Sequence, residues 1–500
     1  MNFETMARFA SGISCILCTM IAFAHPAAAQ VDNGRDTRLR LDQQLDRRRS
    51  EDDRRTLEDA EPDAAPSTIV IDGQSYTVRD TVDDVGKALY IAIGRRQWRD
   101  VDRFLAAYRK LDGHDAALVL YAQGALARNA GRLSEAESRY RALLAAKPDF
   151  LPAQLELARV LFENHKDREA QRAFRALRLR LVTEGAHAEG VLRSVDTFAA
   201  ALARRNGWQG NLAFGPSYST NVNQSSQSYA CLLSMDDGTC LIDRKVPDAI
   251  KAAGLSFEGV LNRRVPLAGH GGVRARVIAF GDIYPQHHRY SQATAIVRVG
   301  YDYQTSRDQI ALSPSFELGT LGSSALYRAA GGNFEWTHTF SPRFTGRFEG
   351  NLRRFDYTLS GYQAQSGPLG DVGLTGWYAL TPSLTLFAGV DLAVKNTPGF
   401  DEGYRQWGGR IGANKAFGQS VNLFVLGSYR QRRNRTYSEL FAATRKDDQY
   451  NVTAIASAPA LKFAGLVPEL VLQYARVEST VDWLYSYRRT SVALRLGRNF

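Results

Sequence analysis

Hydrophobic and polar residues alternate strictly over long stretches of residues 207–500. Between residues 343 and 353 one face carries apolar or small residues, namely Phe344, Gly346, Phe348, Gly350 and Leu352. The other face carries Arg343, Thr345, Arg347, Glu349, Asn351 and Arg353. Side chains alternate across a strand, so this pattern predicts strands with one apolar and one charged face. A soluble β-sandwich has shorter strands and turns its apolar face inward. We therefore expect a transmembrane antiparallel β-barrel.

The number and the connections of these segments fit a barrel. About 14 strands are expected, an even number of the kind found in bacterial outer-membrane barrels. They lie near residues 208–220, 250–264, 272–284, 292–303, 309–318, 327–340, 343–357, 371–380, 383–395, 404–417, 420–432, 449–461, 468–477 and 487–500. Short links such as Ser341-Pro342 alternate with long ones such as residues 223–247. Short turns lie in the periplasm and long loops outside, so both barrel ends are expected in the periplasm.

The charged faces of the strands predict the residues that line the barrel interior. These lumen candidates are Arg274, Arg276, Arg298, Arg347, Glu349, Arg353, Asp391 and Lys395. Two arrangements are open. The side chains either line a wet lumen, or they pair with one another and brace a closed interior.

Residues 80–206 change to the period of helices and contain a repeat. Gly124, Ala136 and Tyr140 have counterparts in Ala158, Ala170 and Phe174. This spacing of about 34 residues is typical of tetratricopeptide (TPR) repeats, whose small residues let paired helices approach closely. We expect an α-solenoid hanging in the periplasm, so the whole chain is an α + β multidomain protein. Its groove candidates for binding a client segment are Tyr121, Arg128, Asn129, Arg159 and Glu163; the alternative for each is an ordinary solvated helix residue.

The N-terminal part is expected to hold a leader and an arm. Residues 1–29 read as a cleavable signal peptide, with an apolar core before Ala27-Ala28-Ala29, and the mature chain would begin at Gln30. Residues 30–79 are expected to form a charged flexible arm, for which partial helix is an open alternative, because residues 31–66 have too few apolar residues to fold alone. The arm would end in a small hairpin near residues 68–78.

Composition narrows the function classes. The charged fraction of 23% and the mean hydropathy of −0.30 argue against helical membrane spans. The net charge of +11 is spread over both folded parts, so we expect no nucleic-acid partner. Cys15 and Cys18 would leave with the signal peptide, and Cys231 and Cys240 would form a disulfide in an outer loop.

Residues suited to catalysis are sparse. A barrel enzyme would need Asp, His and Ser near the outer rim, and the nearest candidates are His287 and His288 beside Asp282, and the single His338. A histidine pair in a loop is more often a surface feature, and no serine stands in a Gly-x-Ser-x-Gly elbow. We therefore expect a non-enzyme with no catalytic or metal-binding residues and no cofactor.

The first and last strands carry motifs that resemble a known family. Trp208 opens the barrel, Asn221-Val222-Asn223-Gln224 ends its first strand, and the chain closes on Gly497-Arg498-Asn499-Phe500. With a signal peptide and a short TPR domain ahead, this order resembles the surface lipoprotein assembly modulators (Slam). Trp208, Asn221, Asn223 and Phe500 are the residues expected to serve barrel closure and assembly.

The resemblance implies an outer-membrane translocon that passes specific client proteins, among them lipoproteins, from the periplasm to the cell surface. The expected partners are the client, outer-membrane lipid and the barrel-assembly machinery, since the last strand resembles the one that this machinery reads; docking of a periplasmic chaperone on the repeats is left open. A TPR-barrel exporter of polysaccharide is the alternative, although such exporters usually have longer repeat arrays.

Overall fold

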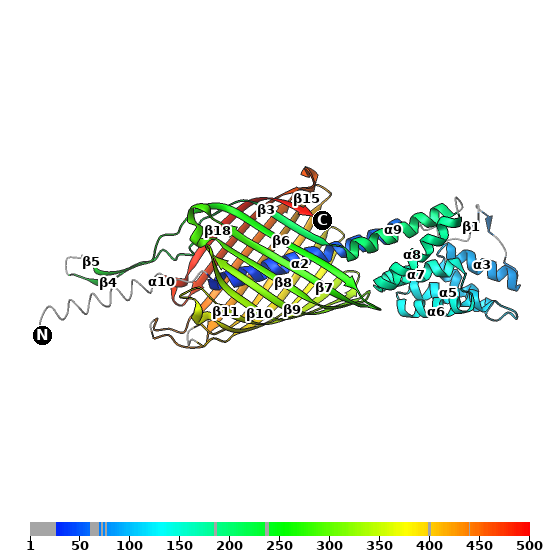
Figure 1. The fold of residues 1–500 in the computed structure, drawn as a ribbon, viewed down its shortest axis with the longest axis horizontal. Coiled ribbons are helices and arrows are strands. Elements are labelled where there is room, and N and C mark those ends of the chain that lie inside the picture. The colour runs from blue at the N-terminus through cyan, green and yellow to red at the C-terminus, as the bar shows by residue number, and fades with distance from the viewer. Residues whose placement is uncertain are drawn as a thin grey trace.

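The computed structural model describes residues 27–60, 70–71, 74–75, 78–184, 188–235, 240–398, 402–439 and 441–500. A β-barrel and a smaller group of helices lie end to end, and one helix runs from the helical group into the barrel (Figure 1). The expected signal peptide falls almost wholly outside the described residues. Among the described residues, no helix is long and apolar enough to cross a membrane.

Fourteen antiparallel strands form a closed barrel in the order β10-β11-β12-β13-β14-β15-β16-β17-β18-β3-β6-β7-β8-β9. The strands are β3 Gln209–Ser219, β6 Ala252–Pro266, β7 Gly271–Ile283, β8 Gln292–Gln304, β9 Asp308–Leu321, β10 Ser324–Ser341, β11 Phe344–Tyr357, β12 Gly367–Thr381, β13 Leu384–Lys395, β14 Tyr404–Phe417, β15 Val421–Asn434, β16 Lys446–Ser457, β17 Val467–Ser479 and β18 Tyr487–Asn499. The predicted barrel and its strand number are confirmed. Closure removes the sheet edges, so no row of backbone donors and acceptors faces lipid.

The outer face of the barrel is apolar and its inner face is polar. Along β11, Phe348 and Leu352 point outward, whereas Arg347, Asn351 and Arg353 are buried inside. Aromatic side chains Trp407, Tyr429 and Tyr450 lie side by side on neighbouring strands of the outer face. A β-sandwich is excluded because the apolar face is the exposed one.

The barrel closes where β18 pairs with β3, and this seam is interrupted. Backbone pairing joins Ala493 to Ser217 and Leu496 to Phe214, but no pair is formed at the two positions between them. Pro216 lies at this gap and has no N–H to donate to the neighbouring strand. A second gap, between β8 and β9, lies opposite Pro314.

The helical group consists of paired helices: α3 Val82–Gly94, α4 Trp98–Tyr108, α5 Ala116–Asn129, α6 Leu133–Ala146, α7 Leu151–Glu163, α8 Asp167–Glu184 and α9 Glu189–Asn206. Gly124 on α5 lies against Tyr140 on α6, so closely that a Cβ at Gly124 would be 2.7 Å from the ring. Phe174 stacks on Phe198, their ring centroids 5.1 Å apart. The predicted TPR-like architecture is confirmed.

The charged arm differs from expectation. Residues Ala27–Ala60 form a single helix of 34 residues, α2, which runs inside the barrel (Figure 1). The segment lacks the apolar residues for a core of its own, but the polar interior of the barrel supplies charged partners that the local sequence does not reveal. Between α2 and α3, β1 (Val70–Ile71) pairs with β2 (Gln74–Ser75), where a hairpin was expected.

The longest outer loop carries a separate hairpin, β4 Tyr229–Ser234 and β5 Cys240–Lys245. Cys231 and Cys240 form a disulfide across it, with an S–S distance of 1.99 Å. Ser226 and Ser228, just before β4, donate hydrogen bonds to the carbonyl oxygen of Trp483 on α10 (Asp482–Tyr485). The base of this loop is therefore attached to the barrel rim.

Candidate functional site

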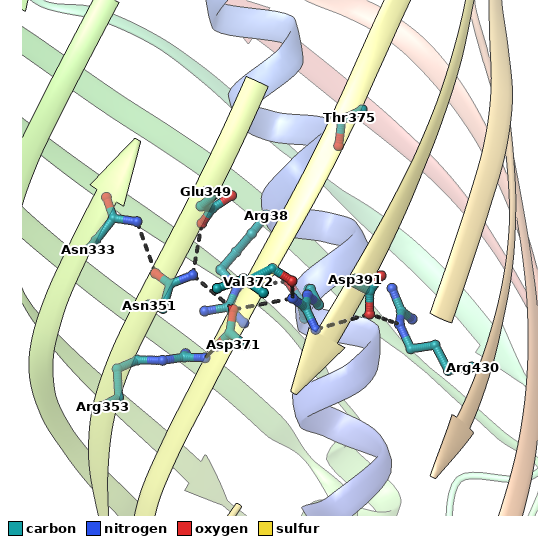
Figure 2. Close-up of polar contacts among 12 residues, drawn as sticks. Arg38, Asn333, Glu349, Asn351, Arg353, Asp371, Val372, Thr375, Asp391 and Arg430 are labelled. Carbon is teal, nitrogen blue, oxygen red and sulfur yellow. Dashed lines mark hydrogen bonds and ion pairs between the residues drawn. The ribbon is translucent and has the colours of Figure 1, made fainter. Parts of the chain in front are cut away.

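The interior of the barrel holds α2 through ion pairs. Arg35 donates to Asp391 at 3.1 Å and to Asp371 at 3.3 Å. Asp36 accepts hydrogen bonds from Arg430, at 3.1 and 2.5 Å, and from Ser428 at 2.8 Å. Figure 2 shows the helix beside these strands, with Asp371 and Asp391 on the wall that faces it. Opposite charges on both surfaces therefore face one another.

Further along α2 the contacts continue toward the helical domain. Arg38 lies 3.5 Å from Glu317, and Arg40 makes a two-pronged ion pair with Glu258. Asp42 accepts a hydrogen bond from Arg276 at 2.6 Å. Charge-assisted pairs of this kind are strong where water is excluded.

One small apolar contact accompanies the ion pairs. Leu41 and Leu45, one helical turn apart, form a cluster with Val260, Ile278 and Ile296 from β6, β7 and β8. Leu41 is fully buried. The site that α2 occupies is therefore an apolar patch bordered by charges of both signs.

One cavity lies beside the described part of the helix. It is lined by Asp36, Thr37 and Arg40 together with residues of β15, β16, β17 and β18, and has a volume of about 40 Å³. This cavity has room for a few water molecules and not for a polypeptide.

The wall charges that hold α2 also have partners on the wall. Asp371 is bound by Arg353 at 2.6 Å and by Asn351 at 2.9 Å, and Asp391 by Arg410 at 2.9 Å. Figure 2 shows Asn333 and Asn351 continuing this network across neighbouring strands.

The other charged wall residues that contact α2 also have partners on the wall. Glu317 accepts from Arg353 at 2.8 Å, and Glu258 lies 2.8 Å from Arg495. Arg430 lies 3.5 Å from Asp391, and Arg276 lies 3.6 Å from Glu335.

All eight lumen candidates from the sequence point into the barrel. They are Arg274, Arg276, Arg298, Arg347, Glu349, Arg353, Asp391 and Lys395. Most pair with other wall residues, as in the contact of Arg298 with Glu335 at 2.8 Å. Lys395 lies over the ring of Tyr357. Of the two open arrangements, the structure has the paired interior, and α2 completes it.

A chain of ion pairs connects α2, the helical domain and the barrel wall. Asp53 of α2 accepts from Arg205 of α9 at 2.8 Å, and Arg205 donates to Asp167 of α8 at 2.7 Å. Asp167 lies 3.4 Å from Arg264 of β6, which donates to Asp302 of β8 at 2.5 Å. These ion pairs therefore link the helical domain to both α2 and the barrel wall.

Electrostatic interactions keep the carboxylate of Asp167, in the middle of this chain of ion pairs, ionised. Burial acts to raise the pKa of Asp167, but Arg205, His165 and Arg264 outweigh it and lower that pKa below its usual value. Burial lowers the pKa of His165 to about 4, and the nearby cation of Arg205 acts in the same direction. The imidazole is therefore neutral at pH 7.

The groove candidates of the repeats come together in part. Arg128 lies 3.0 Å from Glu156 and 2.5 Å from Glu163, and Arg159 lies 2.7 Å from Glu156. Tyr121 is buried beside them, between the rings of Tyr90, Tyr140 and Phe150. Asn129 lies exposed near the end of α5 and is in none of these contacts.

The closure candidates lie at both ends of the seam. The Asn221 side chain donates to the backbone oxygens of Ser225 and Arg488, and Asn223 donates to that of Asp248. At the other end, Phe500 exchanges two backbone hydrogen bonds with Gly210. Trp208 is half exposed, with Arg263 over its ring.

The histidines that sequence reasoning weighed for catalysis are not grouped. His287 and His288 lie on a short 3-10 helix, η2 (Pro285–Tyr290), and His338 bonds Asp308 at 2.7 Å. Among the described residues, no cluster of His, Cys, Asp or Glu is arranged to hold a metal ion.

Known proteins resemble the chain over nearly its whole length. Residues 208–500 match the family model described as "Surface lipoprotein assembly modifier", and residues 71–174 match its "N-terminal TPR repeats". The chain belongs to the surface lipoprotein assembly modifier family. The closed barrel with its apolar outer face, in a chain of this family, is an outer-membrane barrel. The family is one of secretion and assembly modulators rather than of enzymes.

Two relatives illustrate the range of similarity. The "Hemophilin secretion modulator" of Acinetobacter baumannii is 34% identical over 93% of this chain and 96% of its own. "Surface lipoprotein assembly modifier 1" of Neisseria meningitidis is 23% identical over 86% of this chain and 85% of its own. Among solved structures, the channel DcaP of Acinetobacter baumannii shares 10% identity at a TM-score of 0.36, covering 59% of this chain and 96% of that one. That likeness is too low to support an argument about function.

Sequence reasoning missed the charged residues of α2 as functional residues. The signal available was the mixed charge of residues 35–42, which matches the mixed charge of the predicted barrel interior. Neither pattern alone indicates that the two surfaces meet.

Proposed function

We propose that this protein carries specific client proteins across the outer membrane to the cell surface. The observation that carries the proposal is a closed barrel filled by a helix that only noncovalent contacts hold in the lumen, joined to a periplasmic repeat domain by ion pairs. Such an assembly is closed at rest and has an element whose displacement would open it. The names of the relatives, which refer to surface lipoproteins and to hemophilin, agree with this role.

In this proposal the repeats recruit the client. Arg128, Arg159 and Glu163 lie together on the repeat domain, beside the buried Tyr121, and would receive an extended client segment, as TPR grooves do. Asn129 is a weaker candidate for client binding because it makes none of these contacts. The barrel-assembly machinery, outer-membrane lipid and a periplasmic chaperone are further proposed partners, and we infer that the chain acts without catalysis or cofactor.

Protease shaving of intact cells, with and without the gene, tests the function. We expect one or a few proteins to vanish from the surface and to remain in the periplasm. An unchanged surface proteome with loss of an extracellular polymer would support polysaccharide export instead.

Deletion of residues 80–205 tests the division of labour. The barrel should still reach the membrane, because its strands close without the repeats, while client display is lost. Normal display by the truncated chain would contradict recruitment by the repeats.

A further inference from the structure

We propose that the surface occupied by α2 is a binding site for a segment of the client, and that α2 is its resting occupant. The inference rests on the proposed function and names the chemistry of the partner. The segment would be amphipathic, with two leucine-like residues one helical turn apart and charges of both signs beside them.

The charged residues on the wall of the site would keep ion-pair partners after α2 leaves. Each wall charge that contacts residues 35–42 of α2 keeps a second partner on the wall, as Glu258 keeps Arg495 and Asp371 keeps Arg353. Removing one member of a buried pair is costly when the other is left alone, and among these described contacts each wall charge retains a partner. The helix is therefore held firmly and can still be exchanged.

The side chains of α2 are compatible with exposure to water outside the barrel. Within residues 35–45 three leucines are buried, Leu39, Leu41 and Leu45, whereas the side chains that pair with the wall are charged and are well hydrated when released. Release of this segment would place these three leucine side chains in water together with a larger number of charged groups.

The site also defines what can replace α2. The apolar patch of Val260, Ile278 and Ile296 has Glu258 on one side and Arg276 on the other. Glu258 would repel a purely acidic segment, and Arg276 would repel a purely basic one. A segment with both charges flanking leucine-like residues satisfies all three features.

The repeats are placed to sense and drive the exchange. Arg205 binds Asp53 of α2 and Asp167 of α8 with the same guanidinium, so a shift of α8 or α9 pulls on the helix end. Client binding to the repeats and release of α2 are thereby coupled through one side chain.

A reversible covalent cross-link between α2 and the barrel wall tests the exchange in cells. In the full-length double variant D36C/S428C the two thiols would face each other, because the native side chains are hydrogen bonded at 2.8 Å. A short bis-methanethiosulfonate, whose two sulfinate leaving groups are displaced by the two cysteine thiolates to form reducible disulfides, should lower client display at least tenfold relative to the same untreated variant, and reduction should restore it. Reductant also opens the Cys231–Cys240 disulfide, so untreated cells given reductant are the control. Full display by the locked chain overturns the proposal.

A peptide tests the site without any client. Full-length D36R protein, with α2 loosened, is placed in a planar lipid bilayer, and a synthetic peptide of residues 31–57 is added. We expect the peptide to block the current at least tenfold more tightly than a permuted peptide of the same composition. Equal block by both peptides, or block by neither, overturns the proposal.

The two hypotheses fail separately. If deleting the gene leaves the surface proteome unchanged, the proposed function is wrong, whereas the peptide experiment still decides whether the site exists. If a client is lost on deletion but the locked chain displays it normally, the function stands and the exchange is wrong.

Discussion

Reversing one charge on α2 should release the helix from the barrel. Asp36 accepts hydrogen bonds from Arg430 and Ser428, and Arg410 and Arg35 lie nearby. The D36R substitution removes charge-assisted bonds worth ~1.5–3 kcal/mol each. It also places like charges close together, at a cost of ~4 kcal/mol per pair at 4 Å and an effective dielectric constant of ~20.

Relaxation and water will offset part of this cost, so we expect a net loss of ~4 kcal/mol. Since 1.4 kcal/mol is a factor of ten, the released fraction should rise by about a thousandfold. The matched control is D52R, the same substitution on the same helix at an exposed position.

Maleimide labelling of an L41C reporter measures the release. Leu41 is fully buried, and Cys231 and Cys240 are joined in a disulfide, so the reporter would be the accessible thiol of the mature chain. L41C should label slowly alone or with D52R, and rapidly with D36R. Equal labelling rates in all three proteins would refute the proposed role of the ion pairs.

Three further predictions concern the repeats and the outer loop. Because the pKa of His165 is lowered from 6.5 to about 4, stability of the repeats should be complete above pH 6.5 and fall by up to ~3 kcal/mol as the pH drops to 4. Thermal melts from pH 7 to 4 measure this fall, and H165N should reduce it, since Asn tolerates the positive φ of 55°. G124A should destabilise the repeats by ~1–3 kcal/mol through contact with Tyr140, whereas G94A, with open space around it, should not, as melts of both variants can establish. C231S/C240S should increase protease nicking of the β4–β5 hairpin and leave the heat-induced gel shift of the folded barrel unchanged.

The strands were the most predictable part of the chain. β14 begins and ends at the expected residues, 404 and 417, because an alternating run is bounded there by loop residues on one side and Gly418 on the other. β16 lies a few residues earlier than expected, at Lys446–Ser457. Its first residues are charged, and Asp447 is buried against Arg445, a contact that alternation alone does not anticipate.

The content of the lumen could not be predicted in the same way. The repeats were visible because Gly124 and Tyr140 have counterparts 34 residues later, in Ala158 and Phe174. The ion pairs between α2 and the barrel wall join residues more than 200 positions apart, such as Arg40 and Glu258, and depend on the closed barrel. Charge matching between distant segments has no period, so it leaves no signal in a sequence window.

The position of α2 also constrains the order of biogenesis. The helix precedes every barrel strand in the chain, yet it ends up encircled by a ring that closes only when β18, the last strand, pairs with β3. Either the ring forms around a helix already laid in place, or the helix threads in afterwards from the periplasm. In the first case α2 is a template on which the nascent wall is assembled, and its arginines arrange the carboxylates of strands that have not yet met.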